Sequence, residues 1–269
     1  MSTDSALLDR VDAYLDAVPR HDADAVEVGP FTLFRSHAPY PLYARPRRGA
    51  GATVTEADVR ELGHRCAELG VPLAVEWVQE VSPEVAPAAA GAGLEVVSYP
   101  LLVLTADTFT PQASEGRVEV ASSRDALAAA RAVANVAFSN GGTAVGPVGT
   151  AERDAGRDAL QPAHLDHFVR DADSGRAITV GLHLPGEGVV AAGVVKPVDG
   201  TAEIMGVATL PAFRRRGFGA AVTSRLVELA VAAGVSLVLL SADGDDVARV
   251  YERLGFRRIG HTGQAEAAR

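Results

Sequence analysis

The chain has 269 residues, of which 34 are acidic and 25 basic, giving a formal net charge of −9, and 48% are apolar. This composition is typical of a soluble globular protein, and the negative charge argues against a general nucleic-acid binder, which needs a basic face. The length predicts two domains of ordinary size, each able to bury its own core.

The N-terminal segment predicts a surface helix over residues 5–18, because its apolar residues fall on one helical face and its aspartates mostly on the other. This segment lacks the basic and apolar regions of a signal peptide. No apolar run in the chain approaches the roughly 20 residues of a membrane span. The single cysteine, Cys66, excludes an intramolecular disulfide and fits a reducing compartment. We therefore expect a cytoplasmic protein that does not bind membranes.

The rest of the first half alternates short strands with helices. Residues 26–43 predict short strands broken by turns. Thr55 and Asp58 form a capping-box-like start for a helix that Gly70 ends. The remaining elements expected there are a strand at 71–78, then a short helix, a glycine turn and one or two strands within 82–104.

A polar stretch at residues 105–116 is a reasonable linker, after which the second half begins with a strand at 117–121. Ser122 and Asp125 form a capping box for an alanine-rich helix that ends near Phe138. Further elements are a loop at 139–150, a polar helical stretch to about residue 170, and strands at 177–184, 189–195 and 202–210 joined by short hairpin turns. The chain then shows a helix ended by Gly234, a buried strand at 235–240, a helix at 245–254 and a last strand. The expected fold class is mixed α/β.

The stretch "VATLPAFRRRGFGAA", residues 207–221, places three arginines against two glycines. A P-loop would continue from Gly219 with Lys and Ser or Thr, and the residues there are two alanines and a valine. A dinucleotide fingerprint would have a third glycine where Val222 stands. Two readings stay open from the turn alone: an anion site built from the first amides of a helix, and a solvated basic turn.

The neighbouring residues favour the anion site. The pattern Arg214-x-x-Gly217-x-Gly219, preceded by the strand "AEIMGVATLP" and followed by "VYERLGF", resembles the Gcn5-related N-acetyltransferase (GNAT) family. The resemblance covers roughly residues 116–269 and implies that acetyl-CoA is the co-substrate. It further implies that backbone groups pair with the pantetheine arm at Val207, Ala208 and Thr209, and that a turn holds the pyrophosphate at Arg214, Arg215, Arg216, Gly217, Phe218, Gly219 and Ala220.

The same resemblance implies the chemistry. Family members acetylate an amine by direct attack in a ternary complex, so the amine must be neutral and the departing thiolate benefits from a proton donor. Tyr251 matches the family's general acid, with packing beneath the cofactor as the alternative role. Glu203 matches the general base of one family branch, with a structural role as the alternative. Many members have an asparagine where this chain has Gly244, which puts side-chain contacts from that position in doubt.

Four other polar residues are candidates for an acceptor pocket, although each is also typical of a surface or structural position: His164, His167, His183 and Asn140. Loops such as 139–150 are expected to determine which acceptor binds. No metal is expected.

The first half of the chain is similar in sequence to the second half, as a degenerate repeat would be. Residues 62–78 align with 226–242, and residues 84–97 align with 246–259, which places Ala89 at the position of Tyr251. The stretch "RPRRGAGA", residues 45–52, can be laid over "FRRRGFGA", although Pro46 then replaces Arg214. Chance similarity among Ala/Gly-rich segments is the alternative.

We therefore expect a tandem arrangement of two GNAT-like domains, each a mixed, mostly antiparallel sheet flanked by helices. Residues 1–113 would be a degenerate copy that scaffolds the other or shapes the acceptor pocket, and residues 114–269 the catalytic domain. The predicted activity is N-acetylation of a small-molecule amine, without nucleic-acid or membrane partners, by a monomer or homodimer. The alternative is a non-catalytic acyl-CoA sensor or interaction module.

Overall fold

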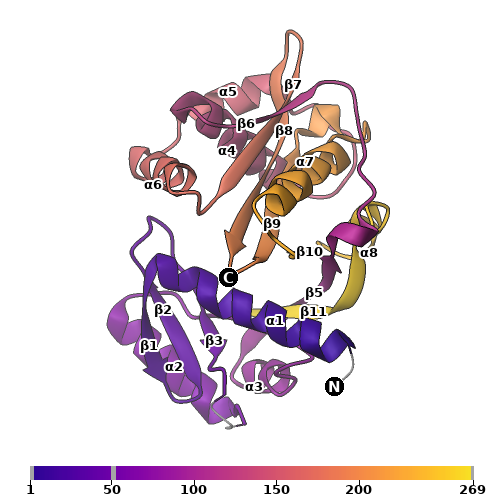
Figure 1. Cartoon of the computed structure of the whole chain (residues 1–269). Helices are drawn as coiled ribbons and strands as arrows, with labels where there is room; N and C mark the ends of the chain where they lie inside the picture. The colour runs from indigo at the N-terminus through magenta and orange to yellow at the C-terminus, as the bar shows by residue number, and fades with distance from the viewer. Residues whose placement is uncertain (1–2, 50–52, 268–269) are drawn as a thin grey trace. The chain divides into compact units, whose positions relative to one another are not determined.

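The computed structural model describes residues 3–49 and 53–267, and the chain divides into two compact units (Figure 1). The first unit comprises Met1–Leu102, Ser241–Gly244 and Arg258–Arg269, and the second comprises Val103–Leu240 and Asp245–Arg257. The expected mixed α/β class is confirmed. The division of the chain into two related domains between residues 113 and 114 remains a prediction.

The first unit is a mixed sheet with helices on both faces. Its strand order is β1-β2-β3-β4-β11-β5. The elements are α1 (Thr3–Ala17), η1 (Val18–His21), β1 (Ala23–Val28), β2 (Phe31–Ser36), β3 (Ala44–Pro46), α2 (Glu56–Leu69), β4 (Ala74–Val78), α3 (Val85–Gly91), most of β5 (Leu94–Leu104) and most of β11 (Arg257–Ala267). Thr55 caps α2 with Asp58 in a capping box and Gly70 ends it at a φ of 65°, as expected.

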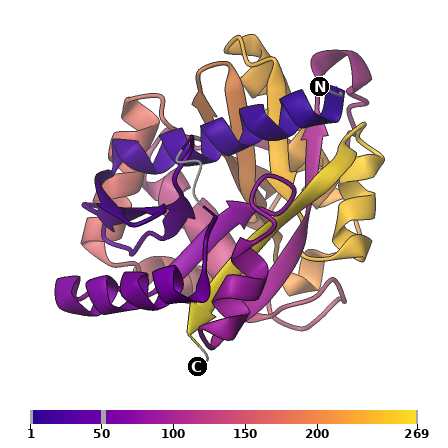
Figure 2. The same cartoon turned by 90° about the horizontal axis from the view of Figure 1, so that it is seen from below.

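The core of the first unit lies between the sheet and helices α2 and α3, and α1 lies on the other face of the sheet (Figure 2). Val75 and Trp77 of β4 point into this core together with Ala265 of β11. A Cβ on Gly263 would come within 2.3 Å of the Trp77 indole, so glycine leaves room for that ring. The last strand of the chain therefore completes a core whose other members lie near the beginning.

The opposite face of that sheet carries a polar row. Register places Thr32, Arg45, Glu76 and Gln264 side by side on β2, β3, β4 and β11. Arg45 is 1% exposed, and its Nη2 donates to Asp12 of α1 at 3.0 Å. Burial raises the pKa of the half-buried Glu76 carboxyl to about 7, an effect that Arg45 opposes.

Glu76 should make stability depend on pH. Because its pKa rises from 4.5 in a free carboxyl to about 7, the folded protein binds this proton more tightly than the unfolded chain. Its stabilising contribution is complete below pH 4.5 and is lost as the pH rises through 7, by at most about 3 kcal/mol. Urea unfolding at pH 5 and pH 8 measures this loss, and Glu76→Gln should reduce it. An equal loss in both proteins would contradict the assignment to Glu76.

The second unit is a five-stranded sheet with order β10-β9-β8-β7-β6, antiparallel except for the parallel pair β9 and β10. Its elements are η2 (Ala106–Thr108), β6 (Arg117–Val120), α4 (Arg124–Ser139), α5 (Thr150–Asp158), α6 (Pro162–Asp173), β7 (Ile178–Leu184), β8 (Gly188–Val198), β9 (Thr201–Thr209), η3 (Pro211–Phe213), α7 (Phe218–Ala232), β10 (Leu237–Ser241) and α8 (Asp245–Glu252). The predicted hairpins at 185–188 and 197–200 are confirmed.

One local prediction in the second unit was wrong, and another was right in type but covers two helices. Ser123, not Ser122, caps α4, because its extended backbone lets the hydroxyl accept from the Ala126 amide at 3.2 Å. The polar stretch before residue 170 forms two helices, since Pro162 starts a new one.

The same local geometry occurs at two places that the predicted repeat aligns, one in each unit. Gly70 follows α2 at a φ of 65° and Gly234 follows α7 at 84°. The next amide in each case donates to the carbonyl five residues earlier, at 3.0 Å: Val71 to Cys66 and Val235 to Ala230. Strand β3 runs parallel to β4 as β9 does to β10. Residues 45–52 align with the arginine and glycine turn, and of these, residues 50–52 lie outside the described residues.

Candidate functional site

Strands β9 and β10 separate within the second unit. They pair only between residues 201–203 and 237–239, whereas β9 continues its pairing with β8 up to Thr209. The backbone from Ile204 to Thr209 therefore has no partner in β10. This open edge contains Val207, Ala208 and Thr209, the residues expected to pair with an extended ligand.

A β-bulge reshapes this open edge. Gly206 and Val207 of β9 oppose the single residue Gly193 of β8, and Gly206 has a φ of 62°. Bulges bend a strand and redirect its groups, and they are frequent next to binding sites. This bulge was not predicted, although a glycine inside a strand pattern is its usual signal.

The bulge interrupts the period-two alternation of a regular strand. Met205 and Ala208 pair with Val194 and Ala192 and so share a face, which leaves Val207 on the other face. Ala202, Ile204 and Ala208 are buried, whereas Glu203 and Val207 are half-buried, as are Met205 and Thr209. Glu203 pairs in register with Lys196 of β8 and Leu239 of β10, at the last residue before the strands separate. The predicted base therefore stands at the point where the open edge begins.

The turn after β9 ends in backbone amides that have no acceptor within helix α7. Arg215 has a φ of 66°, one of two non-glycine residues with positive φ in the ranges 3–49 and 53–267. Gly217 has a φ of 79° and precedes the first residue of α7. The Ala221 amide is the donor to the Gly217 carbonyl at 3.1 Å, so the amides of residues 218–220 precede the helical bonding pattern. Such a helix start, reached through a left-handed turn, attracts anions.

Glycines also let α7 approach the sheet. A Cβ on Gly193 would lie 2.9 Å from Val222 and 3.0 Å from Leu226, both in α7. A Cβ on Gly219 would contact Val207 at 3.8 Å. The first turn of α7 thus lies against the bulge of β9, and the open strand edge and the amides at the start of the helix form one continuous feature.

The three arginine side chains of the turn have different surroundings. Arg216 binds Glu115 at 2.6 Å and lies over the rings of Phe213 and Phe218, with its Cζ 5.7 and 4.8 Å from their centroids. Arg215 is exposed. Arg214 donates to backbone carbonyls of Thr209, Ala137, Asn140 and Ala144.

Tyr251 lies on α8 and is 9% exposed, with its ring edge-on to Phe256 at 6.0 Å between centroids. Burial raises the pKa of its phenol to about 12. The hydroxyl therefore stays protonated across the ordinary pH range and can donate a hydrogen bond. Gly244, where the family has asparagine, adopts a φ of 85°, which asparagine tolerates better than most residues.

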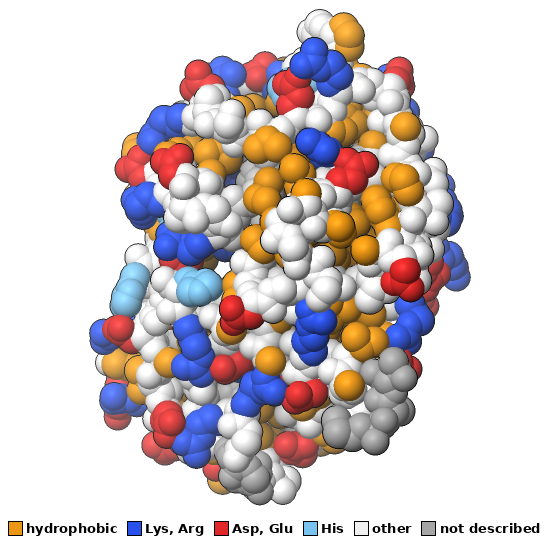
Figure 3. Space-filling view, in the orientation of Figure 1, with side chains coloured by type: hydrophobic (Ala, Val, Ile, Leu, Met, Phe, Trp, Pro, Cys, Tyr) orange, Lys and Arg blue, Asp and Glu red, His pale blue; other side chains and the backbone are white. Residues whose placement is uncertain are grey.

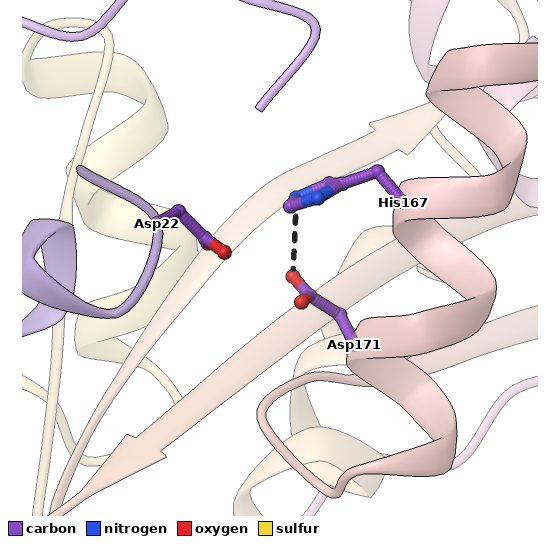
Figure 4. Close-up of side chains that lie close together, drawn as sticks. All are labelled: Asp22, His167 and Asp171. Carbon is purple, nitrogen blue, oxygen red and sulfur yellow. Dashed lines mark ion pairs between the residues drawn. The ribbon is translucent and has the colours of Figure 1, made fainter. Parts of the chain in front are cut away.

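The other polar candidates occupy structural positions. His167 is buried in α6, 3.4 Å from Asp171 one turn later (Figure 4). Asp171 also accepts from Arg176 at 3.0 Å and lies 3.6 Å from Lys196. His183 lies 3.9 Å from Glu119 across the β6–β7 pair.

Asn140, the last of these candidates, ends α4 and donates to the Val136 carbonyl at 2.9 Å. His164 is half-buried in α6. Neither residue lies on the β9 edge or in the turn that follows it, so neither is part of the candidate site described above.

The surface agrees with the composition. Basic and acidic side chains are interspersed on the face in Figure 3, without an extended basic area. Among the described residues, no helix has the length and apolar character needed to cross a membrane.

Comparison with known proteins identifies the fold. Residues 179–264 match a family model described as FR47-like protein. A GCN5-related N-acetyltransferase from Kribbella flavida is similar over 96% of this chain and 95% of its own, with 22% identity and a TM-score of 0.71. A putative GNAT-family acetyltransferase from Novosphingobium aromaticivorans has 20% identity over 90% and 89% of the two chains, with a TM-score of 0.52.

A tandem GNAT protein from the clavulanic acid biosynthesis pathway is also similar, with 16% identity, coverage of 99% and 95%, and a TM-score of 0.56. No curated protein matches the sequence. The predicted resemblance to GNAT proteins is confirmed. The structural similarity to these proteins covers nearly the whole chain.

Proposed function

We propose that this chain, which has the fold of GCN5-related N-acetyltransferases, transfers an acetyl group from acetyl-CoA to the amine of a small molecule in the cytoplasm. The observation that supports this most directly is the edge of β9 at Ile204–Thr209, which lacks a partner in β10 and leads into the amides of the arginine and glycine turn. An extended arm with amide groups, followed by a pyrophosphate, matches that sequence of donors and acceptors.

In this proposal most of the affinity for the co-substrate comes from the main chain. Val207, Ala208 and Thr209 pair with the pantetheine arm, and the amides from Arg214 to Ala220 bind the pyrophosphate. Arg215 is the arginine of the turn that is best placed to add charge-assisted bonds, since it is exposed while Arg216 is already paired with Glu115.

The chemical step is direct attack of a neutral amine on the thioester. The new C–N bond forms as the C–S bond breaks, the amine nitrogen loses a proton, and the sulfur gains one. Tyr251 is the proposed donor to the sulfur, because its buried phenol stays protonated. Glu203 is the proposed acceptor of the amine proton, directly or through water, since it lies where β9 and β10 separate. No metal takes part.

The first half is proposed to be a degenerate copy. Ala89, which aligns with Tyr251, is fully buried in the first-unit core and offers no proton donor. Residues 1–113 would therefore scaffold the protein, and residues 114–269 would carry out the reaction as a monomer or homodimer.

Release of free thiol from acetyl-CoA, with a panel of aliphatic, aromatic and amino-acid amines, tests the activity. We expect thiol release with at least one amine, matched by an acetylated product in mass spectrometry. Calorimetric binding of CoA without turnover of any amine would instead support the non-catalytic acyl-CoA sensor.

A further inference from the structure

Arg214 connects the candidate cofactor turn to the segment between α4 and α5, residues 137–149. Its Nη2 donates to the carbonyls of Asn140 at 2.7 Å and Ala137 at 3.0 Å, and its Nη1 donates to Ala144 at 3.1 Å. Its Nε lies 3.4 Å from the Thr209 carbonyl at the end of β9. All three guanidinium nitrogens are therefore engaged with backbone oxygens.

The backbone makes the same connection twice. The Gly146 amide donates to the Pro211 carbonyl at 3.1 Å, and the Ala212 amide donates to the Val148 carbonyl at 2.9 Å. These bonds join residues 144–149 to η3, which directly precedes Arg214.

The physical chemistry of a guanidinium group explains why an arginine makes these contacts, and the explanation does not require a bound ligand. The Ala137 carbonyl at the end of α4 accepts from the Asn140 amide at 3.2 Å and has a second lone pair for Arg214. A cation at a helix C-terminus is also favoured by the helix dipole. The planar guanidinium can donate to several carbonyls at once, whereas a lysine ammonium is a compact point charge. Losing such charge-assisted bonds costs more than losing neutral ones.

The connected segment carries two apolar side chains that are left exposed. Phe138 is 63% exposed and Val145 is 61% exposed, more than the other large hydrophobic residues in the described part of the chain. They lie beside the carbonyls that Arg214 binds, at Ala137 and Ala144. Arg214 therefore fixes the segment that presents them.

We propose that Arg214 is a positioning residue: its guanidinium holds residues 137–149 against the cofactor turn, so that acetyl-CoA binding and the order of this segment are coupled. The inference rests on the proposed acetyl transfer for its effect on the acceptor, which would be an amine with an apolar portion that contacts Phe138 and Val145. Reciprocal coupling of this kind between two sites is typically five- to 150-fold.

Hydrogen exchange of the free protein tests the clamp without any ligand. In Arg214→Ala the amides of Gly146 and Ala212 should exchange at least about tenfold faster, and Arg214→Lys should not restore their protection. Arg225→Ala, which removes an exposed arginine paired with Glu228, is the matched control and should leave both amides unchanged. Unchanged exchange in Arg214→Ala would overturn the proposal.

Binding and kinetics test the consequence. Arg214→Ala should weaken calorimetric binding of CoA about fivefold or more, because the order of the segment is coupled to the cofactor turn, and should raise the KM for an apolar amine about tenfold, and Arg214→Lys should restore neither. A large loss of CoA affinity that Arg214→Lys restores would instead assign the guanidinium to the anion. If the wild-type protein fails to bind CoA, the proposed function fails, while the exchange experiment still decides whether Arg214 is a clamp.

Discussion

Replacing Gly217 with glutamate is expected to weaken acetyl-CoA binding at least about a hundredfold. A Cβ at this position has no heavy atom within 4 Å, so the new side chain extends into open space beside the amides of the turn. A carboxylate there would compete for those amides and repel the pyrophosphate, and opposed like charges cost several kcal/mol. Calorimetric titration with CoA measures the loss directly.

Gly217→Ala is the matched control for this variant. The φ of 79° strains any residue with a Cβ, at a cost of about 1–2 kcal/mol, so both variants should unfold at a lower temperature than the wild type. Only the glutamate variant should also lose most of its affinity. Equal CoA binding by the wild type and the glutamate variant would refute the assignment of the turn.

Tyr251→Phe is expected to lower kcat about a hundredfold or more, while the affinity for acetyl-CoA stays nearly the same. The variant removes the hydroxyl and retains the ring that packs against Phe256, so the fold should be preserved. General acid catalysis typically contributes 10² to 10⁴ in rate. Steady-state kinetics with a fixed amine, together with calorimetry, separates the two effects.

The pH dependence provides a second readout for Tyr251. Burial raises the pKa of its phenol to about 12, so it remains protonated throughout the range in which activity would be assayed. The pH–rate profile of Tyr251→Phe should therefore keep the wild-type shape at a lower height. An unchanged kcat in Tyr251→Phe would exclude the role of general acid and would assign Tyr251 a packing role.

Local signals accounted for most elements of the fold. The capping box at Thr55 and the glycine at Gly234 mark helix ends through hydrogen bonds within a few residues, so sequence spacing suffices to find them. Gly217 was singled out because a turn of this type depends on backbone freedom, and its φ of 79° agrees with that reason. The position of Ser123 was missed by one residue, since two adjacent serines offer nearly equal caps.

Features that depend on residues far apart in the sequence could not be predicted from local signals. Arg214 bonds to carbonyls about 70 residues earlier in the chain, and a side chain's partners at that separation depend on tertiary packing. The same holds for the separation of β9 from β10, because each strand alone has an ordinary apolar pattern. Residue type therefore predicted the turn, whereas the role proposed for Arg214 rests on contacts between residues far apart in the sequence.

The pairing of β11 with β4 has a consequence for biosynthesis. Residues 262–266 bond to residues 74–78, so the sheet of the first unit gains this strand only after about 190 further residues have been made. Until then β4 has an unpaired edge and the core around Trp77 lacks Ala265. Such non-local pairing slows folding and exposes strand edges during it, so the nascent first half is the stage at which this protein would need a chaperone.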